Sequence, residues 1–424
     1  MPKINVLVFP AGEVNSIELH DALSTCVNIE LFGASSIDRH GSYVFKNYIS
    51  GLPLINDKSF IDKFNEILIE KKIDIVFPTH DTVVKFFADN REKINAKIIC
   101  GDKFTSDVCR DKKKIYELFK DEDFCPKTYN KIETFPVFIK PKESQGSVGA
   151  MLIKSKKDIP SNIDLSDYVI CEYLNGKEFT VDCLTDKDGV LRVVSPRSRE
   201  RIFAGISASG KIEELTKEIK RIAEIINLKL NFLGLWWFQI KQNSKGQWKL
   251  LEVSTRCAGT MALTRARGLN LPLLSVYTAM GYNISVNPNM YNVKMDSTLI
   301  RRYKIDYDYE TVYLDLDDTL IINNQVHLPS IKFLYQCKNQ GKKIILLTKH
   351  DGNVEQTLLR YCINTNLFGK IIHVDENEEK SDYIDPKKAI FIDNAFKERE
   401  MVQNKYNMPV FDVDGIEFLL DWKM

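Results

Sequence analysis

Short apolar runs alternate with amphipathic segments along the first part of the chain. The runs that predict strands are 4–9, 28–32, 74–77 and 96–100, and the helical patterns between them end at about Leu23 and Asn90. Strands that alternate with helices predict a parallel sheet, whose ligands bind at the carboxyl ends of the strands. Gly12 and the turn 79–81 follow two of these strands. We interpret Asp81 as the N-cap of the next helix, with a substrate contact by His80 as the alternative.

The pattern changes at about residue 103 and becomes strand-like further along. An apolar run ends at Lys140, a polar turn carries Gly146 and Ser147, and a second apolar run covers 150–153. Such a hairpin can lay backbone amides over a phosphate chain, to which Lys140 would bring a cation. The alternative is that the glycine and serine serve only the turn.

Polar residues downstream favour the phosphate interpretation. The apolar strand that ends at Glu172 suits a hinge on which an adenine base rests. The backbone groups of Tyr173 and Leu174 would then bind the edge of the base, and Glu178 would accept hydrogen bonds from the ribose hydroxyls.

Two further polar residues lie on the paired strands of a predicted hairpin, whose turn is 243–246. These residues, Gln239 and Glu252, could face one way and hold magnesium through their oxygen atoms. Arg256 follows on the next loop, where it could grip a transferring phosphoryl group. Glutamate and arginine at strand ends are more often solvated surface residues, and the ordered series argues against that alternative.

This series resembles the ATP-grasp superfamily, and within it the carbamoyl-phosphate-synthetase-like carboxylate–amine ligases. The resemblance covers about residues 1–285 and is carried by Lys112, Lys140 with its glycine loop, Glu172-x-Leu-x-Gly-x-Glu-Phe-Thr-Val-Asp, Gln239, and Glu252-x-Ser-x-Arg. It implies an α/β protein with a Rossmann-like pre-ATP-grasp domain over residues 1–102 and a two-lobed α+β ATP-grasp domain over 103–290.

The resemblance also implies a ligand set and a reaction. The residues expected to bind ATP are Lys112, Lys140, Gly146, Ser147, Glu172, Tyr173, Leu174 and Glu178, and those expected to bind Mg²⁺ are Gln239, Glu252 and Ser254. In this family a carboxylate attacks the γ-phosphate, and an amine captures the resulting acyl phosphate. Arg256, with Arg199 and Arg201, would stabilise that intermediate. The family usually has asparagine at the position of Ser254, so this metal ligand is expected to be weaker.

A second alternation of strands and helices follows a connector over residues 291–308. The expected strands are 312–316, 343–347, 370–374, 389–392 and 409–411, and the expected helices begin near 329, 353 and 395. This pattern predicts a small, separate, doubly wound domain over 309–424. Asp315 and Asp317 come directly after its first strand, where they could share one magnesium and one phosphate.

An acidic turn that binds nothing is the alternative, but three residues near later strand ends argue against it: Thr348, Lys380 and Asp393. The order of these residues resembles the haloacid dehalogenase (HAD) phosphatase superfamily, whose DxDxT motif is matched by Asp315, Asp317 and Thr319. The short intervals between the motifs imply a capless member of that superfamily.

The HAD resemblance implies that Asp315 attacks phosphorus to form an aspartyl phosphate. Asp317 would protonate the leaving group and then activate water. Thr348 and Lys380 would hold the phosphoryl oxygens, and Asp393 would complete an Mg²⁺ site with the two motif aspartates. Asn394 stands where an acidic residue is frequent, so Glu398 is expected to supply a second carboxylate.

Together the two resemblances predict a bifunctional enzyme, an ATP-dependent amide-forming ligase fused to a magnesium-dependent phosphatase. The expected partners are small-molecule carboxylate and amine substrates and a phosphorylated metabolite. One alternative is a C-terminal domain that serves as a non-catalytic lid or interaction module. A second is an ATP-grasp part that acts as a nucleotide-binding sensor or scaffold without turnover.

Composition adds little to this picture but excludes some classes. The 424 residues are 44% hydrophobic and 28% charged, as in ordinary globular proteins. A net charge of +1 gives no electrostatic case for binding nucleic acid or an acidic membrane. Nine cysteines without a CxxC pair, no signal-peptide pattern and no apolar run of membrane-spanning length predict a cytoplasmic protein. A homodimer is expected as the commonest assembly.

Overall fold

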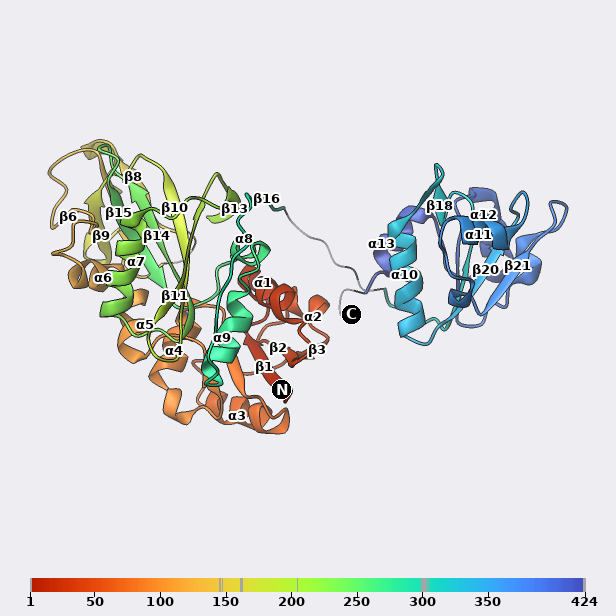
Figure 1. Ribbon diagram of the computed structural model, residues 1–424, viewed down its shortest axis with the longest axis horizontal. Helices are drawn as coiled ribbons and strands as arrows, with labels where there is room; N and C mark the ends of the chain where they lie inside the picture. Colours follow the sequence, from red (N-terminus) through yellow and green to blue (C-terminus); the bar gives the residue numbers. More distant parts are fainter. Residues whose placement is uncertain are drawn as a thin grey trace. The chain divides into compact units, whose positions relative to one another are not determined.

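The computed structural model describes residues 2–144, 146, 148–160, 163–203, 205–298, 303 and 305–421. The chain forms two compact units, residues 1–299 and residues 300–424, and each is described by itself. Both units combine strands with helices (Figure 1). Strands and helices alternate over residues 4–98 of the first unit and through most of the second.

The first unit begins with a parallel sheet of five strands in the order β3-β2-β1-β4-β5. Its strands are β1 (Ile4–Phe9), β2 (Ile29–Ala34), β3 (Asn47–Ile49), β4 (Ile75–Pro78) and β5 (Lys97–Ile98). Its helices are α1 (Val14–Leu23), α2 (Gly41–Val44), α3 (Phe60–Glu70) and α4 (Asp81–Asp89). The predicted parallel sheet is therefore confirmed, and β3 and α3 are additions that sequence reasoning missed.

Strand β1 is buried on both faces because its alternate residues belong to two different cores. Val6 and Val8 pack in a core with α1 and with α9 (Leu271–Ala279). Leu7 and Phe9 pack in a second core with α3 and α4. The sheet thus lies between two helical layers, and one of these includes a helix from the far end of the predicted ATP-grasp domain.

The rest of the first unit contains two antiparallel four-stranded sheets. The first has the order β6-β9-β7-β8, with β6 (Thr128–Tyr129), β7 (Val137–Pro141), β8 (Met151–Ile153) and β9 (Tyr168–Glu172). The second has the order β11-β10-β14-β15, with β10 (Glu178–Thr185), β11 (Leu191–Ser198), β14 (Gly234–Gln242) and β15 (Trp248–Ser254). The accompanying helices are α5 (Lys103–Arg110), α6 (Lys112–Leu118), α7 (Lys217–Lys229) and α8 (Ala262–Ala266).

A small third sheet, β12-β13-β16, completes this unit. Its strands are β12 (Arg201–Phe203), β13 (Ile206–Lys211) and β16 (Lys294–Asp296). Strand β16 lies inside the predicted connector 291–308 and pairs antiparallel with β13. Part of that connector is therefore ordered against the first unit.

The second unit has a parallel sheet with the order β21-β20-β17-β22-β23. Its strands are β17 (Thr311–Leu314), β20 (Lys343–Thr348), β21 (Lys370–His373), β22 (Ala389–Ile392) and β23 (Val410–Phe411), with a hairpin of β18 (Ile321–Ile322) and β19 (Gln325–Val326). Its helices are α10 (Leu328–Asn339), α11 (Val354–Arg360), α12 (Phe396–Tyr406) and α13 (Ile416–Leu419). The predicted parallel α/β architecture is confirmed, with β17 at the centre.

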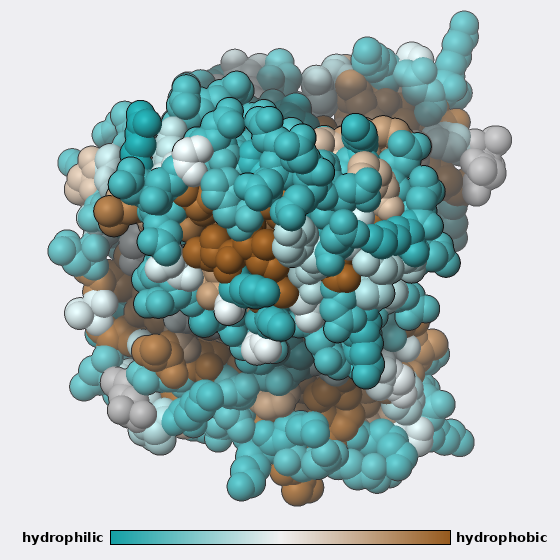
Figure 2. Space-filling view, turned by 90° about the vertical axis from the view of Figure 1, so that its right-hand side faces the viewer, coloured by the Kyte–Doolittle hydropathy of each residue, from teal (hydrophilic) through white to brown (hydrophobic). Residues whose placement is uncertain are grey.

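On the face shown in Figure 2, hydrophilic side chains predominate and apolar ones gather in separate patches. Among the described residues, no helix combines the length and the apolar character needed to cross a bilayer.

Candidate functional site

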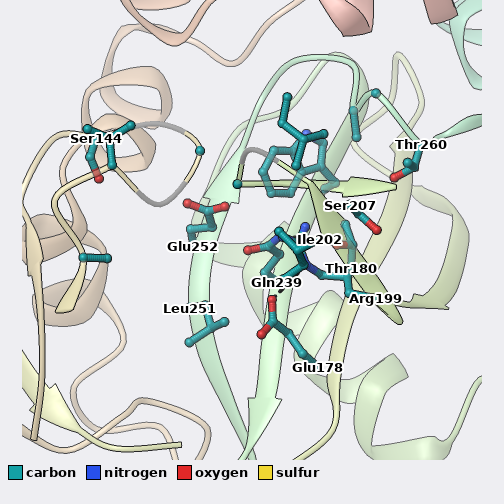
Figure 3. Close-up of a pocket in the computed structure, with 18 of the residues that line it drawn as sticks. Ser144, Glu178, Thr180, Arg199, Ile202, Ser207, Gln239, Leu251, Glu252 and Thr260 are labelled. Carbon is teal, nitrogen blue, oxygen red and sulfur yellow. Dashed lines mark hydrogen bonds and ion pairs between the residues drawn. The ribbon is translucent and has the colours of Figure 1, made fainter. Parts of the chain in front are cut away.

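A cavity of about 690 Å³ lies in the first unit, between the antiparallel sheets and the end of the N-terminal parallel sheet. The predicted residues that line it are Lys112, Lys140, Gly146, Glu172, Tyr173, Leu174, Glu178, Arg199, Gln239, Glu252 and Arg256. In Figure 3, Glu178, Gln239 and Glu252 extend from neighbouring strands, and Ser144 lies across the cavity on the glycine-loop side. Predicted Ser147 falls outside the described residues.

Two lysines in the cavity wall are buried but have only neutral hydrogen-bond acceptors. Lys112 begins α6, and its Nζ donates to the Ser144 hydroxyl (3.1 Å). Lys140 lies on β7, donates to the Leu251 carbonyl (3.0 Å) and lies 5.0 Å from the centre of the Tyr116 ring. Burial lowers the pKa of both lysines, and the nearby charge of Glu252 only partly offsets it. Within the described chain neither lysine forms an ion pair, so both remain able to bind an external anion.

Three side chains that line the cavity, those of Glu252, Gln239 and Arg199, form a hydrogen-bonded series. Gln239 and Glu252 lie opposite each other on β14 and β15. In the orientation that satisfies both neighbours, the Gln239 amide donates to Glu252 (2.9 Å) and accepts from Arg199 (2.5 Å). The Gln239 oxygen predicted to bind magnesium is thus engaged by Arg199, and Glu252 is the carboxylate that remains.

Glu178, predicted to bind ribose, lies between two cations. It pairs with Arg199 at 2.8 Å and with Lys241 at 3.0 Å. Arg201, which was grouped with Arg199 in the sequence analysis, instead pairs with Asp296 on β16 and lies outside the cavity wall. Of these two arginines, only Arg199 lines the cavity.

Glu172, at the end of β9, is tied to the linker before β7. Its carboxylate accepts from the Lys127 amide (2.8 Å), and its own amide donates to the Lys127 carbonyl (2.9 Å). These bonds fix the start of the segment in which Tyr173 and Leu174 line the cavity. On the opposite side Gly146 has a φ of +57°, a conformation that favours glycine.

Arg256 is held by the N-terminal part of the unit. Its Nε and Nη2 donate to the two carboxylate oxygens of Asp81, at 2.6 and 3.1 Å. The Ser254 hydroxyl also donates to Asp81, at 3.3 Å, so this predicted magnesium ligand is directed at a carboxylate. The interpretation of Asp81 as an N-cap is wrong. His80 caps α4 through its ring nitrogen, and the Asp81 carboxylate bonds to these distant residues instead.

A buried network beside Arg199 was not predicted from the sequence. Arg197 is 1% exposed, lines the cavity and forms two hydrogen bonds with Asp182, at 2.8 and 3.0 Å. Thr264 donates to the same carboxylate at 2.7 Å. Asp182 on β10 and Arg197 on β11 stand at positions whose side chains point inward. Side chains alternate between the two faces of a strand, so a charged residue at an inward position could have indicated this network.

In the second unit, Lys380 joins two of the predicted aspartates. Its Nζ lies 2.8 Å from Asp315 and 2.6 Å from Asp393. All three side chains are buried. Burial and the nearby Asp315 raise the pKa of Asp393 to about 6, although Lys380 opposes this shift. Thr348 is fully buried at the end of β20.

Asp317 is half exposed and points to His350, whose Nδ1 lies 2.8 Å away. Asn394 contacts Thr319, and Glu398 pairs with Lys349 at 2.9 Å. No group of three or more acidic, histidine or cysteine side chains is arranged to hold a metal in the described part of the chain. Of the predicted metal-binding carboxylates, Glu252 stands in the first unit, Asp315 and Asp393 pair with Lys380 in the second, and Asp317 faces His350.

Comparisons with known proteins bear on the first unit. Residues 164–299 match a family described as "ATP-grasp in the biosynthetic pathway with Ter operon". Among solved structures, an L-amino acid ligase from Bacillus licheniformis is 15% identical with a TM-score of 0.53, over 66% of this chain and 75% of that one. This region has the ATP-grasp fold.

Two further ATP-grasp structures agree with that assignment. N5-carboxyaminoimidazole ribonucleotide synthetase from Thermotoga maritima is 14% identical with a TM-score of 0.54, over 73% of this chain and 83% of that one. The biotin carboxylase domain of the Hydrogenobacter thermophilus 2-oxoglutarate carboxylase, solved with MgADP, is 14% identical with a TM-score of 0.56, over 68% and 72%. No curated protein matches the chain by sequence. At these identities the likeness concerns the fold.

Proposed function

We propose that the ATP-grasp unit is an ATP-dependent carboxylate–amine ligase that acts through an acyl phosphate. The observation that carries this proposal is the pair of buried, unpaired lysines, Lys112 and Lys140, which face Glu252 across a cavity of about 690 Å³. Buried cations without a counter-charge are costly in a folded protein, and a polyphosphate is a ligand that would neutralise them.

The proposed reaction has two steps. A carboxylate oxygen of the first substrate attacks the γ-phosphorus of ATP, and the bond to the β–γ bridging oxygen breaks to release ADP. The amine of the second substrate then attacks the acyl carbon, phosphate leaves, and the nitrogen loses a proton. Arg256 and Arg199, both in the cavity wall, would stabilise the negative charge on the transferring group.

Magnesium fits this site with one protein carboxylate. Mg²⁺ usually takes one or two carboxylates and completes its shell with phosphate oxygens and water, so Glu252 suffices. When bound, the ion would neutralise charge on the phosphate oxygens. Because the Ser254 hydroxyl bonds to Asp81, we propose Glu252 as its principal ligand, with Gln239 orienting that carboxylate.

Hydroxylamine, which converts acyl phosphates into hydroxamates, tests this proposal. Purified protein is incubated with MgATP, hydroxylamine and a panel of carboxylic acids, and ADP and hydroxamate are measured together. We expect both products in equal amounts with at least one acid, and a loss of about 100-fold in Lys140→Met protein. Release of ADP without hydroxamate for every acid would contradict the acyl phosphate, and no ADP with any acid would favour the sensor alternative.

For the second unit we propose a phosphatase activity that uses Asp315 as the nucleophile. The supporting observation is that Lys380 joins Asp315 and Asp393 in a buried cluster at the carboxyl edge of the sheet. Asp315 would attack phosphorus as the ester oxygen leaves, and water would then hydrolyse the aspartyl phosphate. Magnesium, when bound, would be held by Asp315 and Asp393 and would neutralise charge on the phosphate oxygens.

The test is hydrolysis of p-nitrophenyl phosphate by the full chain. We expect Asp315→Asn to reduce the rate by at least about 1,000-fold, because an amide cannot attack phosphorus as a carboxylate does. Asp318→Asn is a matched control, since Asp318 is exposed and has a left-handed backbone that asparagine tolerates. Equal rates in wild type and Asp315→Asn would favour a non-catalytic lid or interaction module.

A further inference from the structure

We propose that Asp81 is a positioning residue for Arg256, so that the N-terminal parallel sheet sets the geometry of the phosphoryl-binding end of the ATP cavity. This inference rests on the proposed ligase function. Asp81 opens α4, directly after β4, whereas Arg256 follows β15 of the antiparallel sheet. The two residues are 175 positions apart in the sequence.

The Asp81 carboxylate is hydrogen-bonded to the two polar side chains that follow Glu252 in the motif. It accepts two parallel hydrogen bonds from the Arg256 guanidinium and a third from the Ser254 hydroxyl. A bidentate pair between arginine and a carboxylate fixes both the place and the plane of the guanidinium. Two of the three polar residues in Glu252-x-Ser-x-Arg are therefore oriented by a residue outside the ATP-grasp sheets.

Arg256 keeps donors for a ligand after these bonds are made. A guanidinium carries five N–H groups. Nε and Nη2 each use one on Asp81, and Nη1 uses one on the Cys257 carbonyl at 3.2 Å. One N–H on each terminal nitrogen is left, and Arg256 lines the cavity. Asp81 thus orients the side chain without using up its capacity to bind phosphate oxygens.

A purely local role for Asp81 does not explain these contacts. An acidic residue in the first turn of a helix interacts favourably with the helix dipole, and this would suffice at an isolated surface helix. Here His80 already caps α4, and the Asp81 side chain is only 19% exposed. Burial alone would raise the pKa of Asp81, but the charge and hydrogen bonds of Arg256 outweigh it and leave the pKa lowered. Asp81 and Arg256 are therefore both ionised.

The experiment compares two nucleotides that differ in the γ-phosphate. Calorimetry measures the affinity of the full chain for MgADP and for the magnesium complex of β,γ-imido ATP. In Asp81→Asn protein we expect MgADP affinity within about twofold of wild type and β,γ-imido ATP affinity lowered about tenfold, as for the loss of a charge-assisted hydrogen bond. A residue with a merely structural role would weaken both nucleotides alike, and that result would overturn the proposal.

Three variants make the test specific. Asp89→Asn removes a carboxylate from the same helix, where it pairs with Lys85 at the surface, and should change neither affinity. In an Arg256→Gln background, Asp81→Asn should cause no further loss for β,γ-imido ATP, because its effect passes through Arg256. If Asp81→Asn does not fold, Asp81→Glu decides: it keeps the charge but displaces the carboxylate, and wild-type affinity for both nucleotides would overturn the inference. Failure of wild type to bind either nucleotide would overturn the ligase proposal and this inference with it.

Discussion

Buried lysines mark both candidate sites, but their electrostatic surroundings differ. Lys140 in the first unit bonds to a backbone carbonyl, and burial lowers its pKa. Burial also acts on Lys380 in the second unit, but Asp315 and Asp393 outweigh it and raise the pKa. Lys140 therefore has no anionic partner in the protein and can bind an external anion, whereas Lys380 is neutralised by two carboxylates. Two lysines that are buried to a similar degree thus differ in role: Lys380 stabilises the fold, and Lys140 is available to bind a ligand.

The largest effect is expected from Lys380→Met. Removing the cation leaves Asp315 and Asp393 buried together without a counter-charge, which should cost about 3–5 kcal/mol of local stability. Hydrogen exchange of the β17 and β22 amides in the full chain would measure this loss. Lys388→Met is the control, because Lys388 pairs with Glu310 at the surface and should contribute less than about 1 kcal/mol. Equal protection in both variants would show that the Lys380 cluster is not a buried ion network.

A smaller effect on stability, and a large one on binding, is expected from Lys140→Met. No ion pair is lost, so the free energy of unfolding should stay equal or rise, while the affinity for MgATP falls by about 10-fold to 100-fold. Thermal unfolding with and without MgATP separates the two effects. Lys142→Met, two residues along and outside the cavity wall, should bind MgATP as wild type does. A clear loss of stability without nucleotide would remove the contrast with Lys380.

The smallest effect is a pH dependence that comes from Lys140. Because its folded-state pKa lies below the ordinary value of 10.5, the unfolded chain binds the proton more tightly over that interval. The stability of wild type relative to Lys140→Met should therefore rise as the pH increases towards 10.5 without nucleotide. Urea unfolding of both proteins at several pH values checks this sign. A relative stability that falls over the same interval would mean that Lys140 has a carboxylate partner in solution.

Much of the fold follows from local pattern. The strands at 4–9, 74–77, 343–347 and 389–392 were predicted within a few residues, because each is an apolar run bounded by turn residues. Strands β3 and β16 were missed because each is short and begins with a polar residue, so neither forms an apolar run. Helix α3 did carry a signal, since Phe60, Phe64 and Leu68 repeat at helical spacing and are all buried.

The candidate sites were predicted less completely than the fold. The ordered charged residues led to the cavity, and eleven of the predicted positions, Arg199 among them, line it. The partners of those residues were not predictable in the same way. Asp81 was interpreted locally as a helix cap, whereas its bonds go to Ser254 and Arg256. Asp182 lies in an apolar strand and Arg197 in a basic stretch, and only the packed sheet brings them together as a buried ion pair.

The sequence by itself determined the strands, the turns and the order of charged positions, because these depend on neighbours a few residues away. The tertiary structure decided which charges are paired and which are left free. Lys140 and Lys380 each stand near a strand or strand end, and only their distant surroundings differ: a carbonyl and an aromatic ring for one, two carboxylates for the other. Desolvation and pairing energies depend on burial and on distances of a few ångströms, which the packed chain alone sets.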